Sequence, residues 1–421
     1  MSHVPASLSS SSVAWQGWMK FALVSLIFFQ ITAATFTSLG VALPFMIKDL
    51  TWSLSSAGLG FSVLSFMVGI AGRIPSWTLR KFGTRATYGI GGAIMTAGFV
   101  LLALTTGLNQ YLAGAALAGL GYTLCAIVPG VAVINQWLPH KRSFAIGAYM
   151  MIGGLGGVAG PLIVTSVVLS TQSWRMHWWL MAASIAVLAT LAIISLRSRP
   201  DHHADESTMA LPAEKHSSSV YSTQFEWHFG DVLRTPQYYV IVAAMTITLV
   251  GGVTTNSWAV THMGNLGVVI AVAAGALSAQ AFINSSSRAF GGILAARIDP
   301  KWLLVSGLIG EIIGMLALGT ADNMTMMVLF AVGEGYGFGM CLFSTTILLV
   351  NYYGPKEAPK TLGTMHLITT VAMVGPVLGG IVADKVGGFA EVFRTYAVLM
   401  AICLIAVVLM RPPVPHTAAP E

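Results

Sequence analysis

Arg288 is the residue in this sequence whose type and position most strongly suggest chemistry. It lies within the apolar run 268–294, next to Asn284 and the serine run 285–287. An arginine near the centre of a membrane helix costs about 2.5–3.5 kcal/mol, and its guanidinium does not give up its proton. The planar fork of donors suits bidentate binding of a carboxylate. The position therefore predicts an anion-binding site, with Asn284, four residues earlier on the same helical face, as a neutral donor.

Three titratable residues inside apolar runs are candidates for carrying a proton. Glu334 lies in a glycine-rich run, Glu311 lies in the run before it, and His366 follows in the next. Burial disfavours a charged carboxylate, and histidine titrates near neutral pH. The alternatives are structural: either glutamate could pair permanently with Arg288, Glu334 could bond another helix, and the lone histidine could be a packing residue.

Aromatic side chains in the middle of apolar runs are candidates for the walls of an anion pocket. A tyrosine hydroxyl can bind a carboxylate or a hydroxyl group while its ring closes the site. For each residue alone, packing in the core is an equal alternative. The candidates are Tyr122, Tyr336 and Phe338, followed by Phe36 and Tyr149.

The composition indicates that these residues sit in membrane-spanning helices. The chain has 421 residues, of which 55% are apolar and only 9% are charged, against roughly 25% charge in soluble domains. This deficit excludes a cytosolic enzyme, a disordered protein and a nucleic-acid binder, and we find no catalytic, metal or nucleotide motif. Apolar runs long enough to cross a bilayer predict twelve helices, at 21–46, 55–78, 86–107, 110–136, 143–168, 175–196, 238–262, 268–294, 302–320, 323–350, 361–383 and 391–410.

Positive charge predicts the orientation of these helices. If both termini are cytoplasmic, fifteen of the 21 basic residues fall inside and four fall outside, with Arg73 and Arg288 within spans. This is a strong positive-inside bias. The segment 197–237 is polar and is expected to be a cytoplasmic linker between two six-helix bundles, 1–196 and 238–421. Arg73 is expected near the cytoplasmic end of its helix, where it can snorkel or contribute to a gate.

The fifth helix of each half carries a related pattern, which indicates internal duplication. The first has Lys141, Arg142 and Gly147 followed by a glycine-rich stretch that ends at Pro161, and the second has Lys360 and Gly363 before Gly375, Pro376 and Asp384. Glycines four residues apart let helices approach closely, and each proline removes a backbone hydrogen bond and so permits a bend. Such helices suit a transporter in which two bundles rock against each other.

These motifs resemble those of the monocarboxylate transporters, a family of the major facilitator superfamily. The stretch 141–147 resembles the family's signature before helix five, and 375–384 resembles the superfamily's pattern in helix eleven. The resemblance implies the fold of that superfamily, an all-α membrane protein of twelve transmembrane helices, and a substrate-pairing arginine in helix eight, which Arg288 matches. It also implies a proton relay that this chain lacks, because Asn284 replaces the family's aspartate and helix one has no lysine between Lys20 and Lys48.

Together these features predict a secondary active transporter, not an enzyme. We expect it to move a small monocarboxylate, such as L-lactate or a pyruvate-like acid, with a proton by alternating access. A single central cation favours a monoanion, although an exchanger of the oxalate and formate type remains the alternative. We expect a monomer in the cell inner membrane, with no cofactor, no metal and no nucleic-acid partner.

Overall fold

The computed structural model describes residues 10–196, 221–295, 297–354 and 356–414, and every regular element within these ranges is a helix. This confirms the predicted all-α fold class. The first half consists of α1 (Ser10–Ala34), α2 (Phe36–Leu50), α3 (Leu54–Ile70), α4 (Ile74–Ala103), α5 (Leu108–Cys125), α6 (Ile127–Trp137), α7 (Arg142–Thr171) and α8 (Trp174–Ser195). The second half consists of α9 (Phe229–Val232), α10 (Pro236–Asn265), α11 (Ile270–Ala295), α12 (Pro300–Leu318), α13 (Met324–Tyr353), α14 (Ala358–Thr369), α15 (Gly375–Val386) and α16 (Ala390–Leu409).

Ten helical segments of the described chain are long and apolar enough to cross a membrane. One of them, Leu54–Ala103, has 50 residues and changes direction at Gly83, whose φ of 77° only glycine adopts without strain. It therefore provides two crossings. Helix α11 is long enough to span, but its polar residues keep it out of this set. The ten segments provide eleven crossings when Leu54–Ala103 is counted as two, and α11 adds the twelfth. This is the number that the sequence predicts.

Three of the predicted spans are broken near their middle. The first begins at Ser10 and breaks at Thr35, the fourth breaks at Ala126, and the eleventh contains a 3₁₀ turn over 370–374. Prolines close after the second and third breaks, Pro129 and Pro376, lack the N–H that would continue the preceding helix. Pro161, in contrast, lies inside the unbroken helix α7, so a proline that permits a bend does not require a break.

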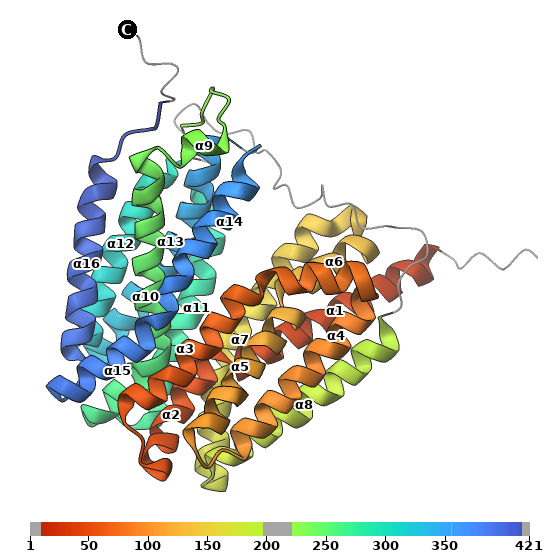
Figure 1. The fold of residues 1–421 in the computed structure, drawn as a ribbon, viewed down its shortest axis with the longest axis vertical. Coiled ribbons are helices and arrows are strands. Elements are labelled where there is room, and N and C mark those ends of the chain that lie inside the picture. The colour runs from red at the N-terminus through yellow and green to blue at the C-terminus, as the bar shows by residue number, and fades with distance from the viewer. Residues whose placement is uncertain (1–9, 197–220, 296, 355, 415–421) are drawn as a thin grey trace, which may run out of the picture.

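The helices form two bundles, α1–α8 and α10–α16, that meet at one end and diverge at the other (Figure 1). The bundles approach each other where α2, α3 and α15 lie. They separate toward the end that carries α6, α9 and the C-terminal end of the described chain. Of the predicted linker 197–237, residues 197–220 lie outside the described residues, and residues 221–237 contain the short helix α9 and the start of α10.

Close helix contacts hold the two bundles together at the converging end. The carboxylate of Asp384 on α15 accepts hydrogen bonds from the backbone N–H groups of Leu54 and Ser55, at 3.1 and 2.9 Å, in the first turn of α3. Gly58 on α3 lies so near α15 that a Cβ there would be 2.6 Å from the carbonyl oxygen of Pro376. A carboxylate at a helix N-terminus satisfies free N–H groups and complements the helix dipole.

Candidate functional site

Arg288 lies on the face of α11 that is turned toward the first bundle. Ser285, three residues earlier, contacts α7, where a Cβ on Gly154 would be 2.6 Å from the serine Oγ. The Arg288 side chain is exposed, and its Nε donates a 3.1 Å hydrogen bond to Oδ1 of Asn284. Within the described part of the chain it forms no ion pair with a carboxylate. The guanidinium is therefore positioned by its own helix and keeps donors free for a ligand.

The first bundle presents a tyrosine to this arginine. Tyr122 on α5 interacts electrostatically with Arg288. The Tyr122 ring packs edge-on against Phe36 of α2, with ring centroids 5.4 Å apart. Thr32 of α1 lies beside Tyr122, and its Oγ1 has no hydrogen-bond partner among the described residues. Helices from both bundles thus bring together a cation, an amide, two hydroxyl groups and an apolar ring.

The other predicted pocket aromatics lie elsewhere. The Tyr149 ring is buried against Phe28 in the first bundle, and its hydroxyl donates to the carbonyl oxygen of Ala126. Phe338 is buried against Gly252 of α10 within the second bundle. Neither residue is brought together with Arg288.

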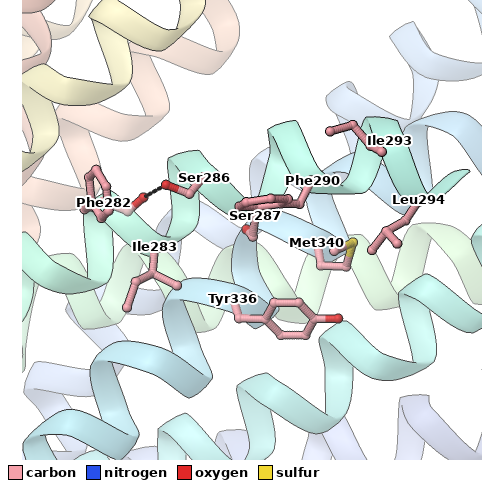
Figure 2. A pocket seen from close by; sticks show the side chains of 9 residues that line it. All are labelled: Phe282, Ile283, Ser286, Ser287, Phe290, Ile293, Leu294, Tyr336 and Met340. Carbon is pink, nitrogen blue, oxygen red and sulfur yellow. Dashed lines mark hydrogen bonds between the residues drawn. The ribbon is translucent and has the colours of Figure 1, made fainter.

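Tyr336 lies on the outer side of the second bundle instead. It lines an apolar groove between α11 and α13 with Ser286 and Phe290 (Figure 2), and its hydroxyl lies 2.8 Å from Oγ of Ser306 on α12. Ser286 is two residues from Arg288, and residues two apart point to nearly opposite sides of an α-helix, about 200° around its axis. The groove therefore follows the face of α11 opposite to Arg288. We therefore assign the groove to the lipid-facing surface and place it outside the anion site.

The two buried glutamates do not pair with Arg288. Oε2 of Glu334 accepts a hydrogen bond from the side-chain amide of Gln280 on α11. The carboxyl oxygens of Glu311 have no hydrogen-bond partner among the described residues. The described chain therefore does not contain the permanent bridge from Arg288 to Glu311 or Glu334 that the sequence left open.

The remaining predicted residues lie away from the centre. His366 is exposed on α14, and Arg73 is exposed in the 3₁₀ turn 71–73. Lys141 lies 5.8 Å from the centroid of the Trp18 ring, while Arg142 begins α7 with its side chain outside the described residues. Nothing lies within 4 Å of a Cβ placed on Gly147. Among the predicted gating residues, Asp384 is the one for which the described structure gives hydrogen bonds between the two bundles, to the backbone N–H groups of α3.

Thr32 and Gln280 were not among the site residues predicted from the sequence. Gln280 could have been found from spacing, because it precedes Asn284 by four residues and Arg288 by eight, which places all three along one stripe of α11. Thr32 carried no comparable signal. It joins the site only because α1 runs beside α5 in the folded bundle.

Comparison with known proteins gives the family. The family model described as Major Facilitator Superfamily matches residues 23–285 and 258–421, and the chain belongs to this superfamily. It is 24% identical over 398 residues to the oxalate:formate antiporter of Oxalobacter formigenes, which covers 91% of this chain and 89% of the relative. It is 22% identical over 363 residues to monocarboxylate transporter 2 of Meriones unguiculatus, covering 79% and 71% respectively.

Solved structures show the same fold. A bacterial homologue of the human lysosomal transporter Spinster, in an inward-facing and occupied conformation, aligns with a TM-score of 0.75 at 15% identity, covering 96% of this chain and 97% of that one. The nucleoside transporter NupG aligns with a TM-score of 0.71 at 16% identity, covering 93% and 98%. The protein is therefore a multi-pass membrane transporter of the superfamily.

Proposed function

We propose that this protein transports small monocarboxylates, of the L-lactate or pyruvate type, together with a proton by alternating access. The observation that carries this proposal is Arg288, an exposed guanidinium between the two bundles without a carboxylate partner in the described chain. A substrate carboxylate would accept its free donors. The hydroxyl groups of Tyr122 and Thr32 and the ring of Phe36 suit a small body with one polar substituent. Resemblance to monocarboxylate transporters supports this assignment.

The described conformation fits one stage of such a cycle. The bundles are closed where Asp384 caps α3 and diverge toward the end of α6 and α9 (Figure 1). The positive-inside pattern assigns this diverging end to the cytoplasm. In that orientation, the diverging end and the C-terminal end of the described chain face the cytoplasm of the cell.

Uptake of labelled L-lactate into proteoliposomes tests the assignment. Arg288→Gln removes the charge and the fork, so we expect uptake to fall about a hundredfold or more. Arg394→Gln is the matched control, because Arg394 pairs with Glu391 on exposed α16, and it should transport as the wild type does. Equal uptake by Arg288→Gln and wild type would refute the role of this residue.

An organic-anion exchanger is the second candidate, because the antiporter relative exchanges oxalate and formate by name. The two candidates differ in their dependence on an imposed pH gradient. Uptake of a monocarboxylate driven by an inward proton gradient supports symport. Counterflow of preloaded oxalate or formate that is indifferent to pH, without gradient-driven accumulation, would favour the exchanger instead.

A further inference from the structure

A pair of buried carboxyl groups lies inside the second bundle, apart from the anion site. Glu311 on α12 is 1% exposed and Glu334 on α13 is 0% exposed. Each faces a glycine of the other helix: a Cβ on Gly337 would lie 2.6 Å from Cγ of Glu311, and a Cβ on Gly314 would lie 2.7 Å from Cβ of Glu334. The two helices thus make room for each acid by omitting the opposing side chain.

This pair has few polar partners and no neutralising cation in the described chain. Gln280 donates to Oε2 of Glu334, while Oε1 of Glu334 and both oxygens of Glu311 have no hydrogen-bond partner. Neither acid forms an ion pair among the described residues. Buried charges are normally paired, and two adjacent unpaired carboxylates would also repel each other.

A hydroxyl group on a third helix is also directed at the pair. Thr248 on α10 is 0% exposed, its Oγ1 has no hydrogen-bond partner within the described ranges, and it lies beside Glu311 and Cys341. A hydroxyl can donate to a carboxylate or accept from a carboxylic acid. The cluster therefore suits a small hydrogen-bonding ligand that removes negative charge, and a proton is the smallest such ligand.

One helix connects this cluster with the anion site. Gln280, Asn284 and Arg288 follow at four-residue intervals along α11, about 6 Å apart per interval. Gln280 bonds Glu334, and Arg288 bonds Asn284. A shift of α11 when an anion binds Arg288 would therefore also move the amide that holds Glu334.

We propose that Glu334 and Glu311 bind the proton that accompanies the anion, with Gln280 as a positioning residue that links this site to Arg288. The proposal rests on the proposed function. The proton resides on the Glu334–Glu311 pair, in which Oε1 of Glu334 and both carboxyl oxygens of Glu311 have no hydrogen-bond partner among the described residues. The titratable group that faces the pair in the described structure is Cys341, beside Glu311. Arg288 lies two turns along α11 from Gln280 and faces the anion site instead.

Two transport measurements test this site in the full-length protein. Glu334→Gln and Glu311→Gln should each lower accumulation of L-lactate driven by a pH gradient at least tenfold. Counterflow of L-lactate at equal pH should stay within twofold of wild type, because exchange requires no net proton movement. Glu391→Gln, an exposed substitution of the same type, should preserve both activities. Wild-type accumulation by both glutamine variants, or accumulation that follows a sodium gradient at constant pH, would overturn the proposal.

A spectroscopic measurement separates this proposal from the transport assignment. Infrared difference spectra of the purified protein during pH titration should contain the carbonyl stretch of a protonated carboxylic acid, which weakens in both glutamine variants. This signal needs no substrate, so it persists if another anion is the cargo, and its absence from wild type overturns the proton site alone. Gln280→Leu, which removes the amide donor, should shift the pH dependence of the same signal toward higher pH. An unchanged pH profile would exclude Gln280 as a positioning residue.

Discussion

The Tyr122 hydroxyl of the first bundle lies close enough to Arg288 to be influenced by its charge. Tyr122→Phe keeps the ring and its packing on Phe36 but removes the hydroxyl. A hydrogen bond from this hydroxyl to the substrate would contribute about 1 kcal/mol, so we expect the KM for L-lactate to rise about five- to tenfold with little loss of folded protein. Initial rates of uptake over a concentration series measure this change.

Tyr336→Phe is the matched control for that experiment. Its hydroxyl meets Ser306 beside the outer groove, and we expect an unchanged KM. If Tyr336→Phe weakens binding while Tyr122→Phe does not, the assignment of the pocket to the face of Arg288 is wrong.

The sequence revealed the centre of the site but not its surroundings. Arg288 and Asn284 could be recognised because a charge in an apolar run has few explanations. Tyr149 and Phe338 could not be distinguished from Tyr122, because an aromatic side chain in an apolar run suits a cavity wall and a packed core equally. Only the folded bundles show which faces are turned toward Arg288.

At the scale of elements, we expect the cap that α15 provides for α3 to act as a latch between the bundles. Asp384→Ala would leave the N–H groups of Leu54 and Ser55 without this partner, at a loss of about 1–3 kcal/mol, or about five- to a hundredfold in the equilibrium between closed and open. We expect spin labels across the converging end to report a larger open population. Asp322→Ala, in the exposed turn before α13, is the control, and identical distance distributions for both variants would contradict the latch.

The close contact of α2 with α10 makes a second prediction about elements. A Cβ on Gly40 would lie 1.8 Å from the carbonyl oxygen of Asn256, whereas nothing lies within 4 Å of one on Gly72. Gly40→Ala must therefore separate the helices, and we expect a lower melting temperature or a shift away from this conformation. Gly72→Ala should melt as wild type does. Equal melting temperatures and equal spin-label distances between the bundles for the two variants would show that this contact does not determine how closely α2 and α10 pack.

The element boundaries show which local signals can be read from sequence. Pro129 and Pro376 lie just after breaks and could have located them, since proline ends the hydrogen bonding of the preceding turn. The break at Thr35 has no proline or glycine beside it. There the hydroxyl groups of Thr35 and Ser38 donate to backbone carbonyl oxygens of the preceding turn, and such bonds often bend helices. Pro161 marks no break, because α7 continues through it, so a proline alone does not locate a break.

At the scale of the whole molecule, a ligand bound between the bundles should stabilise the fold. A ligand at one hundred times its Kd contributes about 2.7 kcal/mol. We therefore expect L-lactate to raise the melting temperature of the purified wild type by a few degrees and to leave Arg288→Gln unchanged. A chloride salt at the same ionic strength is the control, and an equal rise in both proteins would indicate a nonspecific salt effect.

Helix α11, which carries Arg288, has a low hydropathy for a membrane-spanning helix. It turns Arg288 toward the space between the bundles and Phe290 toward the outer groove, yet the run 268–294 is still predicted as a span from the sequence. Arg288, Asn284 and the serine run 285–287 interrupt its apolar residues, and polar residues inside a membrane span are often functional. In relatives without a structure, the predicted span with the lowest hydropathy is therefore the first place to search for a substrate-binding residue.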